Sequence, residues 1–218
     1  MLASDDSADF MGQLNRDLWK ACSSSNPEEA EMLLECGAKV NGTSMDYGGK
    51  AALRIAVDAE GPTVRMLETV KNVLRHSRVA VDQLATDGMT ALHSALVLGK
   101  HEVARLLLKH GADLSKCTAD GRTALICAVT SGTVPAVEIC LDSAADVASL
   151  LRTPAPDGST PCVMAFRLGF QDVVSYLMEM GADAPSEGEA GQPSPVPPQG
   201  DEGAEDPASA EAASSADP

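Results

Sequence analysis

The side chains that could do chemistry in this chain are four histidines and six cysteines, and their spacing matches no common site. His101 and His110 stand nine residues apart on one predicted short helix, too far for both to hold a metal ion directly. No C-x-x-C occurs, and Cys127, Cys140 and Cys162 fall on apolar positions of predicted helices. We therefore expect solvated or capping histidines and reduced, packed thiols, with no metal and no cofactor.

Sequence motifs for the common enzyme chemistries are absent. The chain contains no G-x-x-x-x-G-K-[ST], G-x-G-x-x-G, G-x-S-x-G or H-E-x-x-H. A Cys–His nucleophile pair stays open, although Cys127 and Cys140 have the pattern of core residues. A redox sensor at Cys117 also stays open, because this cysteine falls in a predicted hairpin and is the one most exposed by the pattern. We expect a protein that is not an enzyme.

The elements that would position these side chains follow a repeating pattern, which is clearest from Asp87 to Asp113. Asp87-Gly88 is a turn dipeptide, and Thr90 is a candidate helix N-cap. Alanine and leucine then form an apolar stripe on a short first helix, and a second helix is predicted from about Lys100 to His110. The turn returns 33 residues later at Asp120-Gly121. Helices this short need a neighbouring pair on each side, so the pattern predicts a stack of repeats.

The central unit is similar to a known repeat family. Thr90-Ala91-Leu92-His93-Ser94-Ala95 resembles the T-P-L-H-x-A signature of the ankyrin repeat, and Leu106-Leu107-Leu108 with Gly111-Ala112-Asp113 resembles the end of its second helix. The resemblance implies that the side chains of Thr90 and His93 form hydrogen bonds within and between repeats. The His position is occupied elsewhere by Arg54, Ile126 and Val163, so we expect this network to weaken outside the central repeat.

Repeats and resemblance together predict an all-α fold, an ankyrin-repeat solenoid of about five helix-loop-helix units with short hairpin turns. The repeats are expected at about 10–40, 47–82, 87–116, 120–153 and 157–184, which gives a domain at 10–184. Residues 1–9 are expected to be a disordered N-terminal arm. Residues 185–218, with eight Asp or Glu and no Lys or Arg, are expected to be a disordered acidic tail rich in Pro, Ser, Ala and Glu.

Two predicted connections depart from the regular pattern. Asn41–Gly49, before the second repeat, is longer than its equivalent in the central repeat. The connection between the fourth and fifth repeats is four residues longer than the one before it. Within it, Arg152–Pro156 is expected to form an extended finger that two prolines stiffen.

Composition limits the partners and the compartment. The formal net charge is −16, and aromatic residues make up only 3% of the chain. An acidic surface argues against nucleic acid or an anionic membrane as a partner. The start, MLASDDSADF, is not a secretory signal, and no stretch approaches the roughly 18 apolar residues of a membrane span. We expect a monomer in the cytoplasm, with the nucleus as a second compartment.

The resemblance implies a concave face, made of the hairpin tips and the exposed side of the first helices. Val97, Leu98 and Leu168 are apolar on this face where the stack itself does not need it. Scattered surface residues explain them equally well. Carried over position by position, the concave face consists of Met89, Val97, Leu98, Arg122, Thr130, Ser131, Ser159, Arg167 and Leu168.

Two further surface features could either bind a partner or be ordinary solvent-exposed segments. Arg65, Lys71, Arg75 and Arg78 form a basic cluster, either a docking site for an acidic partner or a solvated convex face, and we favour the solvated face. Pro195-Val196-Pro197-Pro198 contains a PxxP pattern that suits an aromatic groove. No Arg or Lys flanks it, so we favour a plain linker.

The function that these features favour is a non-enzymatic protein–protein interaction module, or adaptor, which holds a partner protein on the concave face. A first alternative is a regulatory subunit or inhibitor of an enzyme, acting through the stack and the acidic tail together. A second is a redox-sensing protein that uses Cys117.

Overall fold

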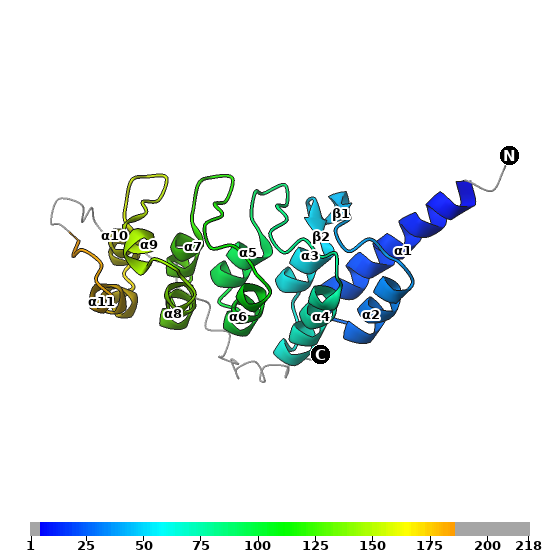
Figure 1. Ribbon diagram of the computed structural model, residues 1–218, viewed down its shortest axis with the longest axis horizontal. Helices are drawn as coiled ribbons and strands as arrows, with labels where there is room; N and C mark the ends of the chain where they lie inside the picture. Colours follow the sequence, from blue (N-terminus) through cyan, green and yellow to red (C-terminus); the bar gives the residue numbers. More distant parts are fainter. Residues whose placement is uncertain (1–4, 186–218) are drawn as a thin grey trace, which may run out of the picture.

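The computed structural model describes residues 5–185, with side chains described from Asp9 onward. Its helices follow one another in pairs that stack in chain order, and a loop projects from the same side of successive pairs (Figure 1). The pairs are α1 (Asp5–Ser23) with α2 (Pro27–Glu35), α3 (Ala52–Asp58) with α4 (Thr63–Arg75), α5 (Ala91–Val97) with α6 (His101–Lys109), α7 (Ala124–Thr130) with α8 (Val134–Asp142), and α10 (Pro161–Arg167) with α11 (Gln171–Glu179).

The starts of three first helices follow directly from local sequence. Thr90, Thr123 and Thr160 hold the N-cap positions of α5, α7 and α10, and each hydroxyl accepts the amide of the residue three positions later. This bond satisfies one of the amides that the first turn of a helix leaves without a partner. Pro161 then occupies the first position of α10, where its missing amide costs nothing.

The core is one continuous band through the stack. Leu18, Val70, Leu107, Leu125 and Leu177, one from each pair, are at most 1% exposed. The main helix contacts within residues 5–185 join members of one pair or of two neighbouring pairs. Each pair is therefore stabilised only by its neighbours, which confirms the predicted all-α solenoid. None of the helices in this range combines the length and hydropathy that crossing a bilayer requires.

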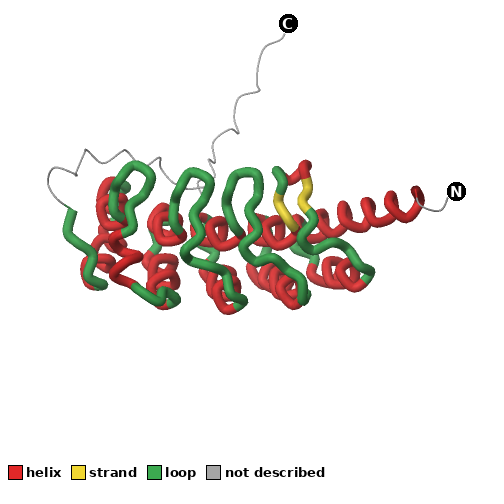
Figure 2. Tube along the Cα trace, turned by 45° about the horizontal axis from the view of Figure 1, so that its top comes forward, coloured by secondary structure: helices red, strands yellow, loops and turns green. Residues whose placement is uncertain are grey.

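The long connection before the second repeat contains the strands of the described residues. β1 (Thr43–Ser44) and β2 (Lys50–Ala51) pair antiparallel, with Thr43 opposite Ala51, and the 3-10 turn η1 (Met45–Tyr47) joins them. This hairpin stands in the same row as the loops of the later repeats (Figure 2). The sequence predicted the extra length of this connection but not its pairing.

Two expectations differ from the structure. Residues 5–9, assigned to a disordered arm, form the first turns of α1, because the helix continues past the part that packs on the stack. The expected finger at Arg152–Pro156 is instead preceded by a further helix, α9 (Val147–Arg152), which Asp146 caps by accepting the amide of Ser149. Leu151 of α9 is buried, so packing stabilises this turn. Residues 1–4 and the tail from residue 186 lie outside the described residues.

Candidate protein-binding surface

Equivalent positions of three repeats supply the residues of the concave face. Met89, Arg122 and Ser159 each stand directly before the N-cap threonine of a first helix, at the base of a hairpin. The other six lie at the ends of α5, α7 and α10, namely Val97, Leu98, Thr130, Ser131, Arg167 and Leu168. The helix pairs stack in chain order, so equivalent positions recur from one repeat to the next along the molecule (Figure 1).

The nine side chains are not equally available to a partner. Val97 and Leu98 are apolar and are 40% and 50% exposed. Met89, Thr130, Ser131 and Leu168 are half-buried, and Arg122 and Arg167 are exposed. Ser159 is only 7% exposed. Its hydroxyl donates to Asp157 Oδ1 at 2.5 Å, so this side chain is bonded within its own hairpin.

The structure brings five of the nine residues together around one hollow. It lies between the fourth and fifth repeats and has a volume of about 530 Å³. Met164 and Pro156, which the sequence analysis did not select, also line it. Met89, Val97, Leu98 and Ser131 lie outside it. The residues around the hollow are Asp120, Arg122, Thr130, Pro156, Asp157, Ser159, Met164, Arg167 and Leu168.

Pro156 explains why the hollow lies at this place. Neighbouring hairpins are joined earlier in the stack, because the Thr86 amide donates to Gly48 O at 3.4 Å and the Ala119 amide donates to Gly88 O at 3.1 Å. The equivalent residue of the fifth hairpin is Pro156, which has no amide hydrogen to donate. The fourth and fifth hairpins therefore lack this link, and space remains between them.

Two ion pairs define the electrostatics of the hollow. Arg122 Nε lies 2.8 Å from Asp120 Oδ2, and Arg167 Nη1 lies 3.2 Å from Asp157 Oδ2. Hydrogen bonds from Ser159 lower the pKa of Asp157, and one from the Thr118 hydroxyl lowers the pKa of Asp120. Both carboxylates are thus charged at neutral pH, and they neutralise the positive charges of the two arginines. A neutral hollow with Met164 and Leu168 in its lining suits an apolar side chain of a partner.

The hydrogen bonds of Thr90 and His93 are present as the resemblance implied. The Thr90 amide donates to His93 Nδ1 at 3.2 Å, within the repeat. His93 Nε2 lies 3.0 Å from Lys116 O, in the hairpin that leads to the next repeat. A buried imidazole therefore joins the third repeat to the fourth hairpin.

The expected weakening of this network at Arg54 is wrong. Arg54 is 5% exposed, and its guanidinium donates to Met89 O at 3.0 Å and to Asp87 Oδ2 at 3.1 Å. Arginine carries more donors than histidine, so it reaches several groups of the next hairpin at once. The expectation is met at Ile126 and Val163, whose side chains have no polar atom to contribute.

Lys50 and Asp58 hold the equivalent positions in the second repeat, and neither was predicted as a site residue from the sequence. Lys50 Nζ lies 2.7 Å from Asp58 Oδ2. Burial by itself would raise the pKa of Asp58, but hydrogen bonds from Lys50 and Ser94 and the charge of Arg54 outweigh it and lower the pKa. The match of Ala51 with Thr90 places these residues level with Met89 and Val97, so sequence alignment could have found them.

The cysteines and the remaining histidines offer no competing site. Cys22, Cys127, Cys140 and Cys162 are buried, and burial raises the pKa of the first three thiols to about 12. Cys117 is exposed, as expected for a hairpin residue. His110 Nδ1 lies 2.9 Å from Leu106 O of its own helix, a capping contact. Within residues 5–185 no group of three or more His, Cys, Asp or Glu could hold a metal ion.

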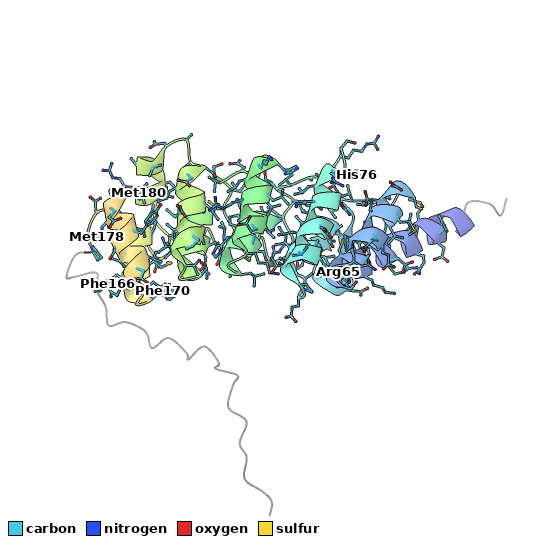
Figure 3. The ribbon with its side chains drawn as sticks, turned by 90° about the horizontal axis from the view of Figure 1, so that it is seen from below. Arg65, His76, Phe166, Phe170, Met178 and Met180 are labelled. Carbon is cyan, nitrogen blue, oxygen red and sulfur yellow. The ribbon has the colours of Figure 1, made fainter. Side chains whose placement is uncertain are left out.

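The basic cluster faces an acidic helix. Arg65 lies 3.7 Å from Glu28 and Arg75 lies 3.9 Å from Glu31, so α4 and α2 balance part of each other's charge. Figure 3 shows Arg65 at the surface of α4, beside α2. These pairs are long and solvent-exposed and contribute little to stability. They agree with the interpretation as a solvated face.

Comparison with known proteins decides the family. Residues 64–150 and 115–188 match the family model described as ankyrin repeats in three copies. The chain belongs to the ankyrin-repeat family. The match covers more than half of the chain and includes the repeats that form the hollow. Proteins of this family use their repeats for protein–protein interaction, so the row of hairpins and first helices has an expected use.

Curated relatives match this chain over only part of their own length. The mouse B-cell lymphoma 3 protein homolog is 28% identical over 159 residues, which are 72% of this chain and 34% of that protein. Mouse protein phosphatase 1 regulatory subunit 27 is 36% identical over 66 residues, 30% of this chain and 43% of that protein. Rat protein phosphatase 1 regulatory subunit 12A is 28% identical over 153 residues, 70% of this chain and 13% of that protein. The alignments cover less than half of each relative.

Proposed function

We propose that this ankyrin-repeat chain is a non-enzymatic protein-binding module, or adaptor, that holds its partner on the concave face. The observation that carries the proposal is the exposed apolar pair Val97 and Leu98 on the same row as a neutral hollow of about 530 Å³. Exposed apolar surface costs free energy in water, and a partner that covers it recovers that cost. Charged residues around the hollow provide the polar rim of such an interface.

Different parts of the concave face would make different contacts with the partner. Val97 and Leu98 offer a flat apolar contact, while the hollow takes one apolar side chain between Met164 and Leu168. Arg122 and Arg167 can each share their guanidinium between an aspartate of this chain and a polar group of the partner. A specific complex needs about 1,000 Å² of buried area or more, so the partner must span several repeats.

A double variant tests the concave face. Leu98→Arg with Arg167→Glu places a charge on the apolar contact and reverses a charge at the hollow. We expect partner capture from a native lysate to fall at least about tenfold, since buried mispaired charge costs several kcal/mol. The thermal midpoint should stay nearly unchanged, because both side chains are at least partly exposed.

A matched control makes the same two types of change on the outer helices. Met32 is 60% exposed on α2, and Arg65 of α4 forms a comparable exposed ion pair. Met32→Arg with Arg65→Glu should leave capture unchanged. Retention of the partner by the concave-face variant, or equal loss in both variants, would contradict the proposal.

The second candidate function is a regulatory subunit or inhibitor of an enzyme. Two of the relatives are named as regulatory subunits of protein phosphatase 1, and this observation favours the candidate. In this version the stack would hold the enzyme and the acidic tail would act beside its active site. The eight acidic residues of the tail, with no Lys or Arg, would suit a basic substrate channel.

Titration of a phosphatase separates this candidate from a simple adaptor. The full chain and a variant without residues 185–218 are added to the catalytic subunit of protein phosphatase 1. A regulatory subunit should change the rate or the substrate preference, and the effect of the tail should disappear in the variant. No change in activity at saturating protein would leave the adaptor as the function.

The cysteines bear on the cellular compartment and on a third candidate function. We place the protein in a reducing compartment, the cytoplasm or the nucleus, on the support of six free cysteines. Redox sensing by the exposed Cys117 stays a third candidate. It requires labelling of native protein by a thiol reagent at a rate far above that of a free peptide thiol.

A further inference from the structure

The last repeat leaves an apolar surface uncovered where the earlier repeats are covered by their successors. Leu96 of α5 and Val129 of α7 are fully buried. Phe166 holds the same position in α10 and is partly exposed. In the second helices, Leu108 of α6 is half-buried and Leu141 of α8 is 2% exposed, while their equivalent Met178 of α11 is 45% exposed. The described chain therefore ends on side chains of the type that interior repeats bury.

We call Phe166, Met178 and Met180 the end face. Met180, directly after α11, is 38% exposed. Figure 3 shows the three side chains at the far end of the stack. Phe170, on the same repeat, does not belong to this set, because its ring packs back against Gly132 of the fourth repeat. Terminal repeats usually present a polar outer surface, so three exposed apolar side chains here indicate that another segment packs on them.

The surroundings of the end face restrict what can cover it. The exposed acidic residues of the last repeat are Asp172 and Glu179 of α11 and Asp183 after it. The Arg152–Asp183 ion pair, at 3.9 Å and open to solvent, neutralises little of this charge. An acidic segment, or a second copy with the same acidic rim, would be repelled. A cover must therefore be apolar and either neutral or basic.

The chain itself continues from this end with a segment of that kind. After Pro185 come 33 residues, and their acidic side chains are Glu187, Glu189 and then none before Asp201. The interval 190–200 contains no charge at all. It holds the main apolar group of the tail, Pro193, Pro195, Val196, Pro197 and Pro198. We call residues 190–200 the neutral window.

We propose that the neutral window folds back and covers the end face. A proline-rich segment suits this role because polyproline II needs no backbone partners and loses little entropy on docking. Proline rings pack well on an aromatic ring, here Phe166, and the two methionines can adapt to the irregular surface. The flanking acidic parts of the tail stay in solvent, away from the acidic rim.

Length and tethering make the contact feasible. Ten residues separate Pro185 from Pro195, and an extended chain of ten residues reaches at most about 33 Å. The end of a helix pair is about 20 Å wide, so the window reaches all of it. A short tether gives an effective concentration in the millimolar range, so even a weak contact is well populated.

Methionine oxidation measures whether the end face is covered. In the first variant of the full chain, residues 193–198 are replaced by alternating Gly and Ser. In a matched control, residues 212–216 are replaced in the same way, and neither change alters the net charge. Peroxide oxidation is followed by peptide mass spectrometry at Met178 and Met180. Met32 and Met45, 60% and 82% exposed on other repeats, serve as internal references.

If the window covers the end face, the first variant should oxidise Met178 and Met180 several-fold faster than the wild type, with the reference methionines unchanged. The control variant should match the wild type. Equal rates at Met178 and Met180 in all three proteins would overturn the proposal. Protection that disappears on dilution would overturn it too, in favour of a second copy as the cover.

Discussion

His93 shows how one side chain can join two repeats and make the joint sensitive to pH. Burial is the main cause that lowers its pKa, and the charge of Arg54 adds to it. The Thr90 amide, which donates to Nδ1, would face a second donor if that nitrogen were protonated. The folded state therefore favours neutral His93. Its contribution to stability is present above pH about 6.5, the unfolded pKa, and is lost as the pH falls below that value toward the folded pKa.

We accordingly expect the free energy of unfolding to decrease when the pH is lowered from about 7.5 to about 5. His93→Gln keeps a side chain that can hydrogen-bond but cannot titrate, so it should flatten this dependence. Urea unfolding followed by circular dichroism at several pH values measures it. The control is His110→Gln, at an exposed histidine, which should keep the wild-type slope. An unchanged slope in His93→Gln would show that other groups cause the effect.

Hairpins are the elements that set the spacing of the concave face. Gly88 has φ of +67°, a conformation that side chains rarely adopt, and its carbonyl accepts the amide of Ala119 from the next hairpin at 3.1 Å. A Cβ at this position would overlap Ala119. Gly158 has a similar φ of +82°, but a Cβ there would meet nothing within 4 Å. Substitutions at the two glycines therefore distinguish the effect of backbone strain, present at both positions, from the effect of hairpin packing, present only at Gly88.

Substitution by alanine should therefore lower the free energy of unfolding by different amounts at these two positions. Gly158→Ala should lower the free energy of unfolding by about 1 kcal/mol, which is the strain of the left-handed conformation. Gly88→Ala should lower it by about 3 kcal/mol, because the hairpins must also move apart. Denaturant unfolding of both variants gives the comparison. Equal costs would mean that neighbouring hairpins do not constrain each other.

On the scale of the whole molecule, the helix pairs of residues 5–185 form an open stack whose first and last pairs lie at opposite ends (Figure 1). The main helix contacts within residues 5–185 link only neighbouring pairs, so stability should vary along the chain. Within the described residues, the fifth repeat packs on a neighbouring repeat on one side, while the third repeat has a neighbouring repeat on each side. Damage at the end should stay local, and damage in the middle should spread in both directions.

Leu177→Ala tests this behaviour at a fully buried position of α11. The cavity should cost about 2–5 kcal/mol of local stability. Hydrogen exchange followed by mass spectrometry should become faster in α10 and α11, with little change in α1 to α4. In Leu107→Ala, at an equally buried position of the third repeat, exchange should rise on both sides of the substitution. A uniform rise along the chain in the first variant would indicate one cooperative unit instead.

Much of the architecture could be predicted because its signals are local. Thr90, Thr123 and Thr160 bond to amides three residues away, and the apolar stripes follow the helical period of the same short segments. The cap of α9 is equally local, since Asp146 accepts the Ser149 amide. This helix was not predicted, because the two prolines that follow it favour an extended segment.

The position of the hollow and the contacts between repeats depend on the tertiary structure. The missing amide of Pro156 opens a hollow only because the Gly121 hairpin stacks beside it. Arg54 replaces histidine in the inter-repeat network only because the next hairpin brings Asp87 and the Met89 carbonyl within its reach. By itself the sequence determined the period, the capped starts of α5, α7 and α10, and the number of repeats. Which side chains are covered, and where space remains, depends on atoms that the stack brings together from more than 30 residues away.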